Sequence, residues 1–95
     1  MVRVFNDRGS CLAAVKISDK IMQGVVNIPT GAWLDPLKNS DISCIHGNPN
    51  VLTNDIGTSK LAQGPSAHTC LVELERFNET PPKISAFDPP KIKVL

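Results

Sequence analysis

No apolar stretch of this chain runs for more than a few residues before a polar or turn-forming residue interrupts it. Residues 2–5 form a short β-type run that ends in the turn cluster 6–10, and residues 11–17 then resume extended structure. Residues 25–28 form a further run that ends at Pro29. These runs predict brief strands, the first two of which form a hairpin with a five-residue loop. Alternation at period two places one set of side chains on a single face, namely Cys11, Ala13, Val15 and Ile17.

The rest of the chain combines short strands with long loops. Residues 43–45 predict a brief strand, and residues 68–76 predict the clearest strand of the chain. Residues 18–22 can form one helical turn, and residues 53–55 can cap a short helix. Alternation along the last strand places two sets of side chains on opposite faces. One set is Cys70, Val72 and Leu74, and the other is mostly Thr69, Glu73 and Glu75. The predicted fold class is therefore mainly β, a small barrel over residues 1–77 with short helical turns and long loops.

Residues 78–95 differ in composition from the rest of the chain. They contain the pairs Pro81-Pro82 and Pro89-Pro90 and show no sustained hydrophobic period. Such a segment favours an extended backbone without internal hydrogen bonds. We predict an extended C-terminal tail that lies over a surface or free in solvent.

Composition excludes several classes of protein. Ninety-five residues make one small domain or a piece of a larger one. Ten basic and nine acidic side chains give a formal charge of +1, which argues against a dedicated nucleic-acid binder. No apolar run approaches the ~20 residues of a membrane span, and residues 1–5 show no targeting signal. One tryptophan and three phenylalanines are few, so the core must consist mainly of aliphatic side chains.

The cysteines and histidines form no recognised catalytic pattern. Cys44-x-His46 and His68-x-Cys70 together offer four zinc ligands, but zinc sites usually contain closely spaced cysteine pairs, so we expect coincidence. Three widely spaced cysteines, with Cys11 as the first, match no disulfide framework. We expect buried or inert thiols rather than a Cys/His nucleophile.

Two loops place small residues beside amide and imidazole side chains. They are residues 46–50, which lead to Thr53, and residues 63–68. Glycine and alanine let a flat ligand approach the backbone closely, and an asparagine amide offers a donor and an acceptor side by side to a heterocycle edge. Two interpretations stay open from these residues alone. The loops bind such a ligand, or their polar side chains only satisfy turn backbones.

Several segments match the sequence patterns of one enzyme family. Residues 2–9 read V-x-V-x-N-x-R-G, and residues 24–26 followed by Trp33 read G-V-V…W. These patterns resemble the carboxy-terminal domain of molybdopterin oxidoreductases, over residues 2 to about 77. Residues 48–53 and 55–64 are similar to the subgroup that reduces S- and N-oxides. This subgroup comprises the dimethyl sulfoxide, trimethylamine N-oxide and biotin sulfoxide reductases.

The resemblance implies a fold and a cofactor. The fold is a six-stranded double-psi β-barrel, here incomplete at its N-terminal side because the family's preceding segment is missing. The cofactor is a bis(molybdopterin guanine dinucleotide) molybdenum cofactor, over which this domain lies. By resemblance, the residues that contact the pterin or the dinucleotide are Asn50, Ala67 and His68, together with Thr53, Gly47 and Gln63.

The implied reaction is oxygen-atom transfer from an S- or N-oxide, which the metal and its dithiolene ligands perform. The metal ligand and the substrate pocket belong to upstream domains of the same enzyme, so we assign no catalytic residue and expect the isolated fragment to be inactive. The intact enzyme would receive electrons from a donor protein. We expect a periplasmic location, with the cytoplasm as the alternative.

Two other functions stay open. The chain could be a stand-alone β-barrel that serves as a binding or interaction module without catalysis. It could also be a small enzyme on the same scaffold, since a fold does not determine a function. If the chain is instead a fragment of the larger enzyme, its incomplete barrel exposes an unpaired strand edge, which favours an edge-strand dimer of the fragment.

Overall fold

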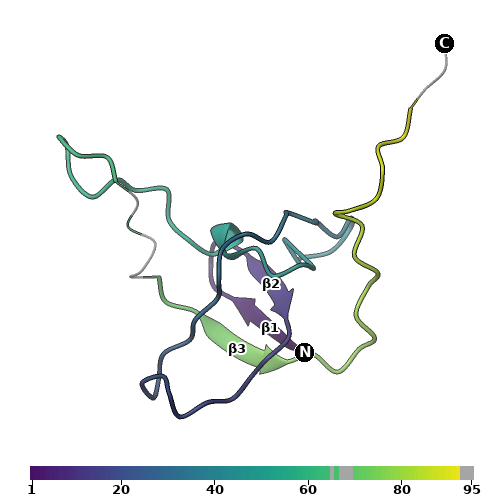
Figure 1. Ribbon diagram of the computed structural model, residues 1–95, viewed down its shortest axis with the longest axis horizontal. Coiled ribbons are helices and arrows are strands. Elements are labelled where there is room, and N and C mark those ends of the chain that lie inside the picture. The colour runs from purple at the N-terminus through teal and green to yellow at the C-terminus, as the bar shows by residue number, and fades with distance from the viewer. Residues whose placement is uncertain (65, 67–69, 93–95) are drawn as a thin grey trace.

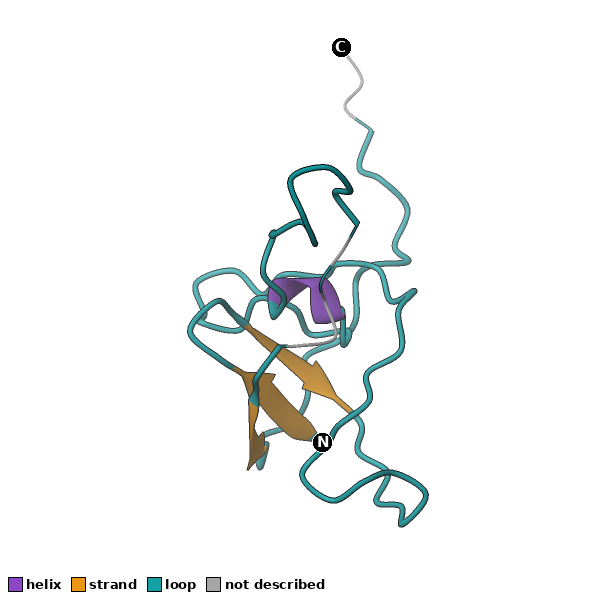
Figure 2. Cartoon of the chain, turned by 90° about the vertical axis from the view of Figure 1, so that its left-hand side faces the viewer, coloured by secondary structure: helices purple, strands orange, loops and turns teal. Residues whose placement is uncertain are grey.

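The computed structural model describes residues 1–64, 66 and 70–92, and its regular elements are few and short. The strands are β1 (Val2–Phe5), β2 (Ser10–Ala13) and β3 (Glu73–Arg76), and a 3-10 helix, η1, spans Pro49–Val51. The strands form one antiparallel sheet with the order β2-β1-β3 (Figure 1). Loops surround this sheet, and among the described residues no helix has the length and apolar composition needed to cross a membrane (Figure 2). The predicted mainly β class is confirmed, and the six-stranded barrel stays a prediction.

The hairpin predicted at the start of the chain is present. β1 pairs with β2 along its whole length, so the loop consists of residues 6–9 and is one residue shorter than predicted. Asn6 closes this loop, because its Oδ1 atom accepts hydrogen bonds from the backbone N–H groups of Arg8 (2.9 Å) and Gly9 (3.2 Å). In such a turn, a short amide side chain takes the place of a backbone acceptor. The local sequence is therefore sufficient to specify the turn.

β2 is shorter than the extended segment predicted up to Ile17. It ends at Ala13, which pairs with Val2, the first residue of β1. Residues beyond Ala13 therefore have no partner in β1, and a strand forms only where a partner completes its hydrogen bonds. Val15 is 54% exposed and Ile17 is 94% exposed. The predicted extended segment therefore forms a paired strand only as far as Ala13.

β3 is also shorter than the strand predicted over residues 68–76. It pairs antiparallel with β1 and has four residues, the same number as β1. Its two glutamates, Glu73 and Glu75, are exposed as predicted. Leu74 lies opposite the buried Val4, yet 47% of its surface is exposed. The predicted inward orientation of Leu74 gives only partial burial, because β3 is an edge of the sheet.

Residues 25–28 run as irregular chain, where the sequence predicts a strand. Val25 donates its N–H to the carbonyl of Met22 at 3.1 Å, which makes a turn around Gly24 with φ of 82°. Among the described residues, no strand pairs with residues 25–28. A β-type composition is therefore not enough to form a strand here. Residues 18–22 likewise form turns and bends instead of the predicted helical turn.

Two apolar clusters form the core, one on each face of the sheet. The first contains Val4, Cys11, Cys44 and Leu52, and the second contains Leu12, Ile42 and Ile45. Cys11 and Leu12 are neighbours on β2, so their side chains point to opposite faces. β2 is consequently covered on both faces, and its first three residues are buried. The core is aliphatic, as the composition predicts.

Two of the three cysteines are fully buried. Cys11 and Cys44 are both 0% exposed free thiols, and their backbones pair in an isolated parallel β-bridge. This bridge is all that forms of the strand predicted at residues 43–45. Burial, with a smaller contribution from Cys44, raises the pKa of the Cys11 thiol to about 11. The prediction of buried thiols is confirmed for this pair, whereas Cys70 is half-buried.

Residues 78–92, the described part of the C-terminal tail, contain no regular element but are attached to the body of the protein. The buried carboxylate of Asp35 accepts hydrogen bonds from the Ser85 backbone N–H (2.5 Å), the Ser85 hydroxyl (2.7 Å) and the Ala86 N–H (2.9 Å). The hydrogen bond from the Ser85 hydroxyl, together with those from the backbone, holds the pKa of Asp35 below its usual range, although burial acts in the opposite direction. This part of the tail therefore lies over a surface, one of the two predicted arrangements.

Aromatic contacts support the same attachment. The ring of Phe87 lies 5.2 Å from the ring of Trp33 and 5.1 Å from the ring of His46, in both cases between centroids. His46 is also fixed by its Nδ1 atom, which lies 3.2 Å from the carbonyl oxygen of Trp33. Trp33, an isolated bulky residue in its own loop, thus packs on a residue 54 positions later in the chain.

Candidate functional site

The segments after η1 line an open cavity of about 430 Å³ with both polar and apolar surface, a size within the range of small-molecule sites. Its lining residues are Asn50, Thr53, Asn54, Asp55, Ile56, Gly57, Gln63, Gly64 and Ser66. Three predicted cofactor residues, Asn50, Thr53 and Gln63, belong to this set. The two loops singled out in the sequence therefore meet at one cavity.

Asn50 reaches this cavity from a capped helical turn. The Oδ1 atom of Asn48 accepts the Asn50 N–H at 2.9 Å, and Pro49 occupies the first position of η1. A polar cap and an N-terminal proline are standard starts of a helical turn, which explains why the turn forms here and not at residues 53–55 as predicted. The Asn50 side chain is exposed, and within the described chain its amide makes no hydrogen bond. Its donor and acceptor are therefore available to a ligand.

A second wall of the cavity is a tight loop that satisfies its own backbone groups. The Thr58 N–H donates to the Gly64 carbonyl at 2.9 Å, and the Ala62 N–H donates to the Ser59 hydroxyl at 2.8 Å. The side-chain nitrogen of Gln63 donates to the Ser59 carbonyl at 2.7 Å. Gln63 therefore helps to shape the wall, and its predicted contact with a cofactor stays a prediction.

The sequence analysis missed Asn54 and Asp55, which also line the cavity. It assigned both to the cap of a helical turn that does not form there. Both side chains are exposed, and no described residue makes an ion pair with Asp55. The available signal was their position directly after Thr53, in a polar segment that leads to Gly57.

Three predicted site residues are not placed at the cavity. Gly47 adopts φ of 74°, and a Cβ atom there would lie 3.5 Å from the Leu12 carbonyl oxygen and 3.8 Å from the Ala13 Cβ. Gly47 therefore lies against β2, outside the set of described residues that line the cavity. Ala67 and His68 lie outside the described residues.

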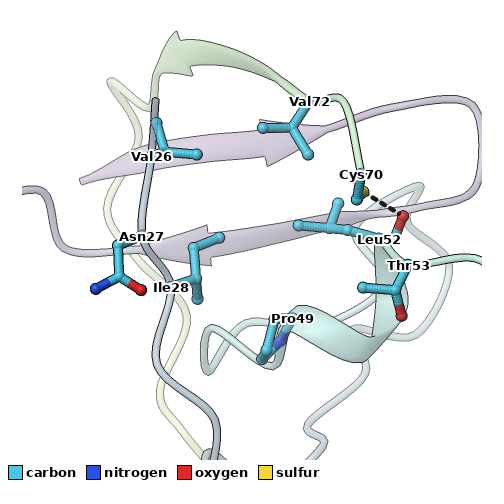
Figure 3. Close-up of a pocket in the computed structure, with 8 residues that line it drawn as sticks. All are labelled: Val26, Asn27, Ile28, Pro49, Leu52, Thr53, Cys70 and Val72. Atoms are coloured by element: carbon cyan, nitrogen blue, oxygen red, sulfur yellow. Dashed lines mark hydrogen bonds between the residues drawn. The ribbon is translucent and has the colours of Figure 1, made fainter. Parts of the chain in front are cut away.

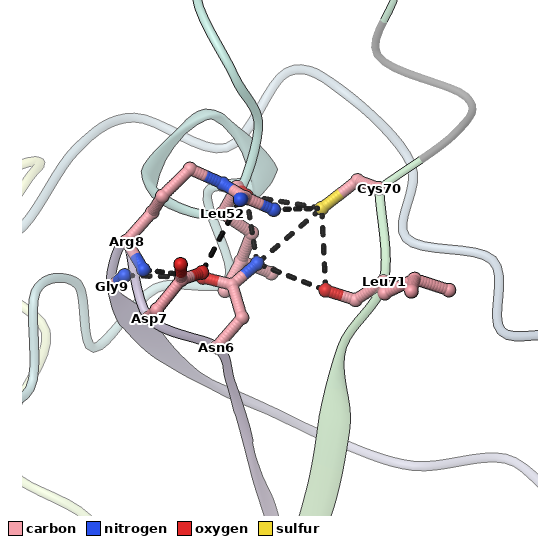
Figure 4. A network of polar contacts seen from close by, with 7 residues as sticks. All are labelled: Asn6, Asp7, Arg8, Gly9, Leu52, Cys70 and Leu71. Atoms are coloured by element: carbon pink, nitrogen blue, oxygen red, sulfur yellow. Dashed lines mark hydrogen bonds and ion pairs between the residues drawn. The ribbon is translucent and has the colours of Figure 1, made fainter.

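A network of hydrogen bonds connects the β1–β2 loop to the end of η1 (Figure 4). The Leu52 carbonyl oxygen accepts from Asn6 Nδ2 (2.8 Å), Arg8 Nε (2.7 Å) and Cys70 Sγ (3.0 Å). Asn6 Nδ2 also donates to the Leu71 carbonyl at 3.1 Å, and Arg8 Nη2 donates to Cys70 Sγ at 3.3 Å. We call Asn6 and Arg8 the clamp residues. The sequence analysis quoted both only as part of a family pattern and gave them no role.

A smaller cavity of about 180 Å³ lies beside η1 and shares Thr53 with the first (Figure 3). Its other lining residues are Val26, Asn27, Ile28, Pro49, Leu52, Cys70 and Val72. Most of these side chains are apolar, and the dashed line in Figure 3 marks the bond between the Cys70 thiol and the Leu52 carbonyl. η1 thus has two hollows beside it, and both combine polar and apolar lining atoms.

The cysteine and histidine pairs do not assemble a metal centre within the described residues. Among them, no group of three or more histidine, cysteine, aspartate or glutamate side chains could hold a metal ion. The Sγ atom of Cys44 is buried and accepts the backbone N–H groups of Asp35 (3.4 Å) and His46 (3.3 Å). His68 of the second pair lies outside the described residues.

Comparison with known proteins gives one family and a consistent set of relatives. Residues 1–71 match the model of the molydopterin dinucleotide binding domain. The chain is 52% identical over 92 residues to the trimethylamine-N-oxide reductase of Salmonella typhimurium, and 53% identical over 92 residues to trimethylamine-N-oxide reductase 1 of Escherichia coli O157:H7. It is 47% identical over 91 residues to the trimethylamine-N-oxide reductase of Vibrio cholerae. Each comparison covers 95% of this chain but 11% of the relative, so the chain spans about a ninth of these proteins.

Proposed function

This chain belongs to the molydopterin dinucleotide binding domain family. On that premise we propose that the larger cavity beside η1, of about 430 Å³, binds part of a molybdopterin dinucleotide. The single observation that carries the proposal is the meeting of Asn50, Thr53 and Gln63 at one cavity. The resemblance to the family implies these same three residues as cofactor contacts. We propose residues 1–77 as the dinucleotide-binding domain and residues 78–95 as its tail.

The chemistry of the lining fits a heterocycle better than a phosphate. The described lining offers amides, hydroxyls and one carboxylate, and it contains neither lysine nor arginine. A diphosphate prefers cationic donors or a helix N-terminus, whereas a ring edge needs neutral donors and acceptors in pairs. The exposed Asn50 amide supplies such a pair. We therefore place a base or a pterin here and the diphosphate elsewhere.

Asp55 supports the guanine form of the dinucleotide. An ionised carboxylate only accepts hydrogen bonds, and the Watson–Crick edge of guanine presents adjacent N–H donors that a carboxylate can accept. Asp55 lines the cavity and has no ion pair with a described residue. We propose that Asp55 accepts from guanine and that Asn50 and Thr53 bind the remaining polar edge. Ala67 and His68 stay proposed contacts by resemblance.

We propose that the intact protein is an S- or N-oxide reductase with trimethylamine N-oxide as the favoured substrate. The relatives that bear this name match nearly the whole chain. The bound bis(molybdopterin guanine dinucleotide) molybdenum cofactor would supply two-electron redox and oxygen-atom transfer chemistry. The residues of this chain would bind and orient the dinucleotide and exclude water from it. An electron donor protein and a periplasmic location complete the proposal by resemblance.

An apolar groove supports contact with further domains of the intact protein. The groove measures about 380 Å³, and its apolar lining includes Val2, Val4, Ala13, Val15, Ile21, Val25, Val26, Ile28 and Leu74. Several of these side chains are about half exposed, and β3 beside them is an edge strand. We propose that domains of the remaining eight-ninths of the protein cover this groove and complete the double-psi barrel.

The second candidate, a stand-alone interaction module, is favoured by the same groove and strand edge. As an isolated chain it would pair its β3 edge with a second copy. The two candidates differ in what covers β3, which is other domains in the first and an identical strand in the second. Because the isolated chain is expected to pair through β3 in both cases, hydrogen exchange at β3 in the intact protein, compared between its monomeric and dimeric forms, separates them.

The experiment that tests the main proposal replaces Asn50 by alanine in the intact protein. The matched control is Asn78→Ala, because Asn78 is also exposed and lies outside the cavity lining. Loss of one neutral hydrogen bond contributes about 1 kcal/mol, so we expect roughly fivefold weaker cofactor retention and a proportional loss of turnover. Acid hydrolysis should release GMP from the wild type. Unchanged cofactor content in Asn50→Ala, or release of CMP, contradicts the assignment.

A further inference from the structure

We infer that the clamp residues Asn6 and Arg8 are positioning residues that hold the η1 wall of the dinucleotide cavity through the Leu52 carbonyl, an inference that rests on the proposed function. Leu52 stands between Asn50 and Thr53, both of which line the cavity. Whatever fixes the Leu52 carbonyl therefore fixes the spacing of two cavity residues.

η1 cannot hold this position by itself. It has three residues, and its internal hydrogen bond runs from the Leu52 N–H to the Pro49 carbonyl at 3.0 Å. A single helical turn is unfavourable on its own, because it orders several dihedral angles for one hydrogen bond. Asn48 caps its start, and the clamp residues bind its end. The orientation of η1 thus depends on groups outside it.

Asn6 connects two parts of the chain through the two ends of its amide. Its Oδ1 atom accepts from the Arg8 and Gly9 N–H groups and closes the β1–β2 loop. Its Nδ2 atom donates to the carbonyls of Leu52 (2.8 Å) and Leu71 (3.1 Å). The oxygen therefore serves the hairpin and the nitrogen serves the cavity wall. Substitutions can separate these two roles.

Arg8 adds a directed donor rather than a surface charge. Its Nε atom donates to Leu52 at 2.7 Å, and Nη2 donates to Cys70 Sγ at 3.3 Å. Only 28% of its side chain is exposed, while that of its ion-pair partner Asp7 is 86% exposed. An exposed ion pair contributes little, so the two directed hydrogen bonds explain why the guanidinium lies here. Lysine cannot reproduce this planar arrangement of donors.

Close contact between the hairpin loop and η1 supports the same role. A Cβ atom at Gly9 would overlap the Val51 carbonyl oxygen and lie 2.9 Å from Ser43 Oγ. The loop therefore lies directly on the backbone of η1, with no room for a side chain. The N-x-R-G segment as a whole fits the end of η1. Asn6 and Arg8 bind it, and Gly9 permits the approach.

The test uses Asn6→Asp in the intact protein, with Arg3→Gln as the control. Aspartate keeps the Oδ1 acceptor for the hairpin loop but cannot donate to Leu52. Arg3 lies on β1 and makes ion pairs with exposed carboxylates away from the cavity. We expect the Leu52 amide to exchange hydrogen about tenfold faster in Asn6→Asp, and the bound dinucleotide, measured as GMP after hydrolysis, to dissociate about tenfold faster at 25 °C. Arg3→Gln should change neither.

If Asn6→Asp does not fold, a second variant, Arg8→Lys, tests the same inference. We expect it to raise the rate of hydrogen exchange at the Leu52 amide and the rate of dinucleotide dissociation, each by a smaller factor. A purely structural role predicts a lower melting temperature with an unchanged dissociation rate, and this result overturns the inference. Equal acceleration of exchange throughout the sheet also overturns it. A wild-type protein that releases no dinucleotide refutes the proposed function and the cofactor part of this inference. In that case, hydrogen exchange at the Leu52 amide still tests whether the clamp residues hold η1, because it should be faster in Asn6→Asp than in the wild type.

Discussion

Replacing Gly9 by alanine measures how closely the hairpin loop lies on η1. The added Cβ atom would overlap the Val51 carbonyl oxygen and approach Ser43 Oγ to 2.9 Å. The Ser43 hydroxyl can rotate away from the added Cβ atom. The Val51 carbonyl cannot move as easily, because Asn6 and Arg8 hold the next residue, Leu52, by hydrogen bonds. Overpacking of this kind costs about 1–3 kcal/mol, and the lower entropy of the unfolded alanine chain offsets about 0.4–1 kcal/mol. The middle of the two ranges predicts that Gly9→Ala destabilises the protein by about 1.3 kcal/mol.

Native-state hydrogen exchange measures this change at the Leu52 amide, which bonds within η1. The matched control is Gly31→Ala, because Gly31 has φ of 110° and no heavy atom within 4 Å of the added Cβ. Its cost of about 1–2 kcal/mol comes from backbone strain alone and stays near Gly31. If Gly9→Ala leaves exchange at Leu52 within about 0.5 kcal/mol of the wild type, the loop does not lie tightly on η1 and the steric argument is wrong.

Two further predictions concern titratable groups. The pKa of Asp35 is lowered, so its contribution to tail attachment is complete above about pH 4 and is lost as the pH falls through the lowered pKa. The fluorescence of Trp33, which packs on Phe87, should report this release, and an Asp35→Asn variant should show no such transition. With a pKa of about 11, Cys11 is a thiolate in roughly one molecule in a thousand at pH 8. Iodoacetamide should therefore modify the half-buried Cys70 well before Cys11, and equal rates would show that the core opens readily.

The parts of the fold that depend only on residues close together in the sequence could be predicted. The β1–β2 hairpin follows from an asparagine that closes a short turn between two β-type runs. The strand ends could not be predicted, because β2 stops where β1 offers no further partner. Residues 25–28 failed as a strand for the same reason. The bonds between Asp35 and Ser85 join residues 50 positions apart, and no local pattern indicates them.

The candidate site divides in a similar way. Asn50 and Thr53 were assigned from the resemblance to the molybdopterin family, and the structure brings both to one cavity, while their contact with a cofactor stays a prediction. Asp55 was missed because its polarity was attributed to a helix cap. The clamp residues Asn6 and Arg8 were missed for a deeper reason. Their role depends on the Leu52 carbonyl, 46 and 44 residues away, which only the folded chain brings within reach.

Charge distribution links the cavity to the rest of the intact protein. A dinucleotide carries two phosphates, which need cationic or N–H donors, yet the described lining of the cavity contains no lysine or arginine. The guanidinium groups of Arg3 and Arg8 are already held by hydrogen bonds within the domain. The proposed cofactor must therefore receive its phosphate contacts mainly from outside this cavity. We therefore propose that this cavity recognises the ring edge and that the clamp keeps its η1 wall in place, while residues outside the cavity bind the phosphates.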